Sequence, residues 1–218
     1  MEAKRRAGAN GRKRKTAGAA RVGAKVTRSS HNGSFEQAIQ KAVSGGGTVS
    51  VGLVNLVKNT LVTAISGARD VGGEMGTAAV AAVRGSIRAA SEIGADLGAV
   101  ARYSIMGTIE AAEQIGGELG GAARTATRDA VKTTRDVGGD VSRVAGEAIQ
   151  GTAEAARRLG ADVGSLVQDA ARGAVEAADR IGSAAGRAVR ATVAEAVSGT
   201  KALGGRHDGA RTTRRRRA

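Results

Sequence analysis

Few side chains in this sequence are of a type and spacing that could perform catalysis or hold a metal. The chain has two histidines and no cysteine, and its carboxylates recur at helical spacing rather than converging on one point. His31 and His207 lie in short polar stretches typical of loops. The stretch from Ser44 to Thr48 is rich in glycine but lacks the lysine of a phosphate-binding loop. We therefore expect no enzyme, no metal, no cofactor and no small-molecule substrate.

Phosphate binding by positive charge is the chemistry that the sequence does offer. The formal net charge is +14; residues 1–28 contribute +9 and residues 204–218 contribute +5, so residues 29–203 are neutral. Clustered Lys and Arg displace counterions from a nucleic-acid backbone, which gives salt-dependent binding. Because no aromatic residue lies among them to stack on bases, we expect the binding to be independent of sequence. The alternative is that the ends only keep the chain soluble.

The candidate nucleic-acid-binding residues are all basic and all lie near the two ends of the sequence. They are Lys4, Arg5, Arg6, Arg12, Lys13, Arg14, Lys15, Arg21, Lys25, Arg28, Arg206, Arg211, Arg214, Arg215, Arg216 and Arg217.

The body between these ends is built on a repeat of 22 residues. The segment Asp70–Gly76 recurs as Glu92–Gly98, and four further copies follow at the same spacing. Twenty-two is twice eleven, and eleven residues make three helical turns at about 3.67 residues per turn, close to the 3.6 of an α-helix. Every charged residue from Glu36 to Lys201 falls on one side of this eleven-residue period. The pattern predicts one helical phase across the body.

The opposite side of the period is apolar and rich in glycine. Each interior glycine costs a helix about 1 kcal/mol relative to alanine, so we expect these glycines to allow close helix packing. The alternative is that they mark a segment that is disordered until a partner binds. The predicted helix-packing residues are Val71, Gly72, Gly76, Ile93, Gly94, Gly98, Ile115, Gly116, Gly120, Val137, Leu159, Gly160, Gly164, Ile181, Gly182 and Gly186.

The predicted fold class is all-α, with long Gly/Ala-rich amphipathic helices that form one rod, fold back on themselves or self-assemble. We divide the chain into a disordered basic arm (1–33), a capped helix, glycine break and apolar helix (34–67), a helical repeat region (68–203) and a disordered Arg-rich tail (204–218). A continuous rod would be about 250 Å long at 1.5 Å per residue. We place breaks at Ser44–Gly47 and at Gly204–Gly205.

Two local signals precede the repeats. Ser34 and Gln37 resemble a capping box and predict a helix start. Residues 48–65 are apolar nearly all round, which predicts the best-buried helix of the chain, although the Thr-Val-Ser-Val alternation leaves a strand as an alternative.

The charged side of the repeat has a basic and an acidic flank. Arg102 and Arg124 are on the basic flank, whereas Asp96 and Asp140 are on the acidic one. Such flanks can pair with neighbouring helices, as charged positions beside a coiled-coil stripe do. The alternative is a solvated face with pairs only within each helix.

The eleven-residue phasing, with Val-Gly-Gly, Ala and Thr and without Pro, resembles the synucleins, the perilipin-type droplet proteins and the late embryogenesis abundant proteins. It is also similar to granule-associated phasins that carry a histone-like basic part. The resemblance to the synucleins, perilipin-type proteins and late embryogenesis abundant proteins covers residues 60–200 and implies helices that form on lipid or during drying.

We predict a non-enzymatic scaffold that self-associates into a homo-oligomer through its helices and binds the DNA or RNA phosphate backbone through its basic ends. The alternative is a coat on lipid droplets, polyester granules or anionic membranes, or a desiccation-type disordered protein. The sequence has no apolar run long enough for a membrane span and no secretory signal. We therefore expect a cytoplasmic protein associated with the nucleoid or with granules.

Overall fold

The computed structural model describes residues 49–65 and 71–212, and these residues are helical throughout except for short turns. This confirms the all-α prediction and the 22-residue unit. The helices are α2 (Val49–Ile65), α3 (Val71–Glu92), α4 (Leu97–Gln114), α5 (Leu119–Asp136), α6 (Val141–Leu159), α7 (Val163–Ile181) and α8 (Ser183–Thr212).

A glycine in the left-handed conformation ends each helix from α3 to α6. Gly94, Gly116, Gly138 and Gly160 have φ angles of 66°, 69°, 75° and 67°. The amide of the next residue donates to the carbonyl five positions earlier, as in Ala95 to Ala90 at 2.8 Å. This is the Schellman arrangement, which closes the last helical turn and reverses the chain. The single phase expected to run through the body is therefore interrupted once in every unit.

An aspartate then starts the next helix at three of the four turns. Asp96, Asp140 and Asp162 accept hydrogen bonds from backbone amides two and three residues later, at 2.8–3.3 Å. These bonds satisfy amides that have no partner inside the helix. At the fourth turn, Glu118 precedes α5 without such a bond. Part of the predicted acidic flank therefore consists of helix caps.

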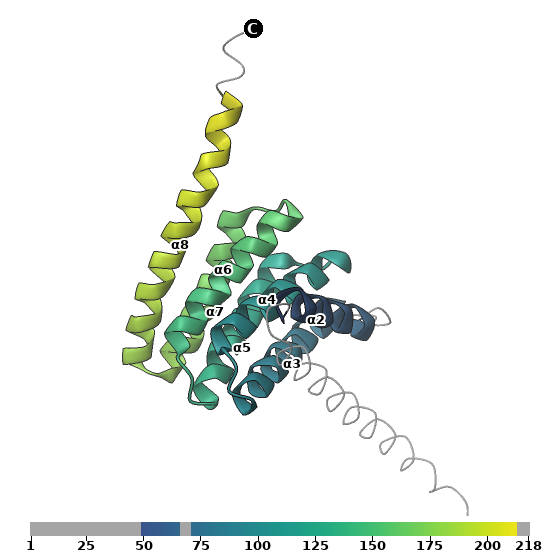
Figure 1. Cartoon of the computed structure of the whole chain (residues 1–218), viewed down its shortest axis with the longest axis vertical. Coiled ribbons are helices and arrows are strands. Elements are labelled where there is room, and N and C mark those ends of the chain that lie inside the picture. Colours follow the sequence, from purple (N-terminus) through teal and green to yellow (C-terminus); the bar gives the residue numbers. More distant parts are fainter. Residues whose placement is uncertain (1–48, 66–70, 213–218) are drawn as a thin grey trace, which may run out of the picture. The chain divides into compact units, whose positions relative to one another are not determined.

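The helices form two layers. Each helix from α2 onward contacts the next helix and the one after it, so α2, α4, α6 and α8 make one layer and α3, α5 and α7 make the other (Figure 1). Consecutive helices run in opposite directions, and the helices within a layer are parallel. This is a helical solenoid, in which each unit contacts only its near neighbours. Of the arrangements left open by the sequence, the body adopts the folded-back one.

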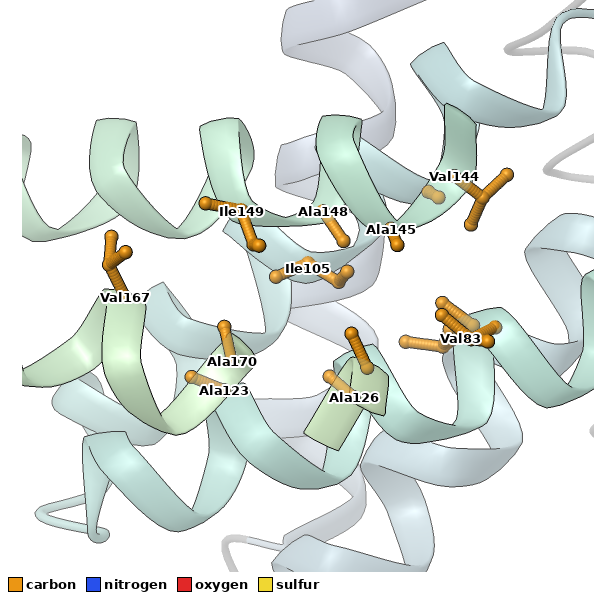
Figure 2. Packing of buried hydrophobic residues seen from close by; sticks show 14 of the residues in the cluster. Val83, Ile105, Ala123, Ala126, Val144, Ala145, Ala148, Ile149, Val167 and Ala170 are labelled. Carbon is orange, nitrogen blue, oxygen red and sulfur yellow. The ribbon is translucent and has the colours of Figure 1, made fainter. Parts of the chain in front are cut away.

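The core between the layers is rich in alanine, with Val, Ile, Leu and Met among the alanines. Figure 2 shows the side chains of Ile105, Ala126 and Ile149 within it, together with Ala145 and Ala148. Alanine keeps the helices close, because it adds little bulk and suits a helix. With one Phe, one Tyr and no Trp, the sequence has few large side chains with which to build a thicker core.

Helix α2 confirms the apolar helix predicted for residues 48–65 and excludes the strand. It is not the best-buried helix, because Asn55, Asn59 and Thr60 are exposed. Helix α4 is buried along most of its length, since it contacts α2, α3, α5 and α6.

At the other end, α8 continues through Gly204 and Gly205 to Thr212, so no break occurs there and the helix extends past the boundary predicted at 203. Figure 1 shows α8 alongside α6 and α7 at the edge of the array. The predicted cap at Ser34–Gln37 and the predicted break at Ser44–Gly47 lie outside the described residues.

Candidate interaction surfaces

Three glycines inside helices bring parallel neighbours of one layer into close contact. A Cβ atom on Gly107 would lie 2.6 Å from the carbonyl oxygen of Val54, and one on Gly151 would lie 2.5 Å from that of Arg102. A Cβ atom on Gly173 would meet the carbonyl oxygen of Arg124. Real Cβ atoms do not approach carbonyls so closely, so only glycine fits these positions. The junctions α2–α4, α4–α6 and α5–α7 therefore depend on them.

The glycines that the sequence predicted to pack helices together lie elsewhere, most of them at turns or in first helical turns. Gly94, Gly116, Gly160 and Gly182 have positive φ angles and open space around any added Cβ, so the prediction that they pack helices together is wrong. Gly98, Gly120, Gly164 and Gly186 are in first helical turns, where an added Cβ would meet acidic side chains rather than a second backbone. Gly76 has nothing within 4 Å of an added Cβ.

The apolar residues predicted to pack helices together differ in how deeply they are buried. Ile115, Val137, Leu159 and Ile181 are partly buried and pack against the core, whereas Ile93 is 41% exposed. All of them lie at or next to a turn. The environments of Val71 and Gly72 lie outside what the structure describes.

Ion pairs join the same neighbours that the glycines bring together. Lys58 pairs with Glu110 at 3.6 Å and Arg102 with Glu154 at 2.8 Å, and Arg124 pairs with Glu176. The partners are always 52 residues apart, so one contact recurs from unit to unit. These glutamates lie between the two flanks in the eleven-residue period. The prediction that the basic and acidic flanks pair between helices is confirmed by Arg84 with Asp129 at 3.2 Å and Arg102 with Glu147 at 3.5 Å. The charges of the body are thus largely satisfied within it.

These pairs shift the acidity of the glutamates. The hydrogen bond from Arg102 lowers the pKa of Glu154, against the opposing effect of burial. The hydrogen bond from Arg124 likewise lowers the pKa of Glu176, with further positive charge from Arg128 and Arg180. Both carboxylates therefore stay charged at neutral pH and hold their arginines in place.

Asp129 is the exception among the junction positions. It occupies the place in α5 that Gly107, Gly151 and Gly173 occupy in their own helices. Its side chain is 8% exposed and lies 3.2 Å from Arg84 of α3 and 3.8 Å from Arg128. The α3–α5 junction is therefore closed by a side-chain ion pair instead of by backbone contact.

Most of the basic candidates near the two ends lie outside the described residues. The candidates from Lys4 to Arg28 and from Arg214 to Arg217 lie outside the described residues, while Arg206 and Arg211 are within α8. In the part of the chain that the structure describes, no group of three or more acidic or histidine side chains could hold a metal ion. None of the helices in residues 49–65 and 71–212 combines the length and the hydropathy needed to cross a bilayer.

Sequence reasoning overlooked the junction glycines, although a signal for them was present. Gly107, Gly151 and Gly173 recur in register with the repeat, in the middle of otherwise strong helix-forming stretches. A glycine that recurs at a helix centre costs stability unless a neighbour approaches there.

No protein-family model and no curated protein matches this chain. The chain is similar to the crystal structure of a de novo designed helical repeat protein, with 23% sequence identity over 82% of this chain and 96% of that chain and a TM-score of 0.46.

Proposed function

We propose that this protein is a non-enzymatic helical scaffold that binds nucleic acid, or another polyanion, nonspecifically through its basic ends. One observation carries the proposal: the net charge of +14 resides entirely in residues 1–28 and 204–218. The charges of the solenoid between them are matched in number and paired across helices, as in Arg102 with Glu154. A rigid neutral body with positively charged ends is suited to tethering or compacting a charged polymer.

The test is binding of the full chain to a labelled 30-base-pair DNA duplex over a range of salt concentrations. Each phosphate contact contributes about 0.9 to the slope of log affinity against log salt. Changing Arg12, Lys13, Arg14 and Lys15 to Gln should lower that slope by about 3.6. Changing Arg214 to Arg217 together should have a similar effect. Duplex binding that is absent, or that does not respond to salt, would refute the proposal.

The proposal includes self-association, but not through the apolar face of the repeat. That face is already buried within one chain, as Ile105 and Ile149 illustrate at 0% exposure. A second copy must therefore dock elsewhere. Sedimentation velocity over a hundredfold range of concentration tests this point, and a monomer at every concentration would remove self-association from the proposal.

The alternative of a lipid or granule coat has less support. A coat helix needs an apolar stripe that faces outward, and Ile93 is the one large hydrophobic side chain that is exposed among the described residues. Flotation of the intact protein with lipid droplets at high salt, where charge attraction is screened, would favour the coat instead.

A further inference from the structure

The solenoid has a surface of its own on which positive charge is concentrated. It is formed by α3 and α5, two neighbouring parallel helices of one layer. We define the α3/α5 basic surface by the six residues Arg84, Arg88, Arg124, Arg128, Lys132 and Arg135. The spacings of four, four and three residues along α5 place its four cations on one side of that helix.

The 22-residue repeat offers an internal control for this concentration of charge. A shift by one unit moves each of the six positions onto α4 or α6, in the opposite layer. The residues found there are Met106, Glu110, Gly146, Gln150, Glu154 and Arg157. Where the α3/α5 basic surface has six cations, these positions have two glutamates, one arginine and three uncharged residues. The folding requirements of the repeat therefore do not demand the positive charge of the α3/α5 basic surface.

The counter-charges of the α3/α5 basic surface are few or buried. Asp129 lies beneath Arg84 and Arg128 with a side chain that is 8% exposed, while those arginines are 38% and 36% exposed. Asp136 pairs with Arg135 at the end of α5, and Glu176 of α7 pairs with Arg124. The charge of Asp169 on α7 also acts on Arg124, so four carboxylates face six cations. Asp129 positions two guanidinium groups and contributes little exposed negative charge itself.

Two cations of the α3/α5 basic surface are free to bind. Arg88 and Lys132 are exposed and form no ion pair with another residue that the structure describes. They occupy equivalent positions on the two helices, 44 residues apart. Helices packed side by side have axes about 8–10 Å apart, and residues four apart on one helix are separated by about 6 Å along it. Each strand of a duplex presents one phosphate group in about every 3.4 Å. Cations spaced as on the α3/α5 basic surface can therefore reach several phosphate groups of one duplex.

We propose that the α3/α5 basic surface is a second nucleic-acid contact, which binds the phosphate backbone of a duplex alongside the basic ends. This inference rests on the proposed function and adds a defined, folded contact to it. Nucleic acid is favoured over a membrane because Ile93, one residue past the end of α3, is the one large apolar side chain exposed among the described residues, and an apolar face that enters a bilayer needs several.

The experiment uses the full chain, the same labelled duplex and three variants. The first is Arg88→Gln with Lys132→Gln, which removes two free cations and no ion pair. The second, a control with the same charge change, is Arg157→Gln with Arg187→Gln on exposed positions of α6 and α8. The third is the Arg12 to Lys15 variant. We expect the first variant to lower the salt slope by about 1.8 and the control to leave it unchanged.

Chemical protection provides an independent readout on the unmodified protein. Acetylation of Lys132 should slow when duplex is bound, whereas acetylation of Lys58, which pairs with Glu110 on α4, should keep its rate. Unchanged rates for both lysines, in a chain that binds duplex, would overturn the inference.

The outcomes separate this inference from the proposed function. If only the Arg12 to Lys15 variant lowers the slope, the ends bind nucleic acid and the α3/α5 basic surface does not. If the intact chain fails to bind duplex, both proposals fall. If the first variant weakens binding to anionic phosphatidylserine vesicles but leaves the duplex slope unchanged, the surface is a membrane contact and the inference is wrong.

Discussion

The α4–α6 and α3–α5 junctions join equivalent helices by different means. At α4–α6, Gly151 lets the backbone of one helix touch the backbone of the next. At α3–α5, Asp129 holds the equivalent place and reaches Arg84 across the junction. The first contact depends on shape and the second on charge. The solenoid can therefore vary how closely two neighbours approach without changing the unit that repeats.

The largest expected effect comes from filling the close junction. Gly151→Ala places a methyl group 2.5 Å from the carbonyl oxygen of Arg102, and overpacking of this kind costs about 1–3 kcal/mol. We expect the midpoint of urea unfolding to fall accordingly.

The control is the same substitution at Gly199 in α8, where nothing lies within 4 Å of the added Cβ. There the gain in helix propensity should stabilise the protein by about 1 kcal/mol. Equal effects at the two glycines would mean that the close contact at Gly151 does not limit packing.

The charged junction should respond less strongly. Asp129→Ala removes a buried hydrogen-bonded carboxylate, which costs about 1.5 kcal/mol because Arg84 is partly exposed and regains water. Asp136→Asn, on an exposed pair, should change the free energy of unfolding by less than about 0.5 kcal/mol. A loss at Asp129 no larger than the loss at Asp136 would contradict a structural role for the Arg84–Asp129 pair.

Gly138, at a turn, provides a contrast with Gly151. It matters because of its backbone conformation and not because a neighbour lies close to it. Gly138 has a φ of 75° and open space around it. Gly138→Ala should cost about 1 kcal/mol in thermal or urea unfolding. Gly138→Asn should cost less, since asparagine tolerates the left-handed region. If the two substitutions cost the same, strain at this turn is not the cause.

The smallest expected effect is the dependence of the free energy of unfolding on pH. Because Arg102 lowers the pKa of Glu154 in the folded protein, the pair stabilises the fold above the ordinary pKa of glutamate, and this stability is lost as the pH falls through the lowered value. The contribution should stay below about 1 kcal/mol, since both side chains are partly exposed. Glu154→Gln should flatten the loss of stability as the pH falls below about 4.3, which urea unfolding over a pH series would measure.

The sequence was sufficient to predict the helical class, the unit length and the pairing of flanks, because each depends on periodicity. The periodicity wrongly predicted one helical phase without turns. A continuous helix and a repeated helix-turn unit of the same length produce the same periodicity. The distinguishing signal is local: Gly160-Ala161-Asp162 contains a C-terminal glycine followed by an N-cap aspartate. The junction at Gly151 could be suspected from the repeat, but its partner Arg102 could not, because that depends on how the two layers stack.

Because each helix contacts the next two, successive helices alternate between the two layers. Removing one 22-residue unit would move every later helix into the opposite layer, but the glycine contact and the ion pair between neighbours occur in both layers and would find equivalent partners. Removing 44 residues would restore each later helix to its own layer. An odd step would exchange the two faces of everything downstream.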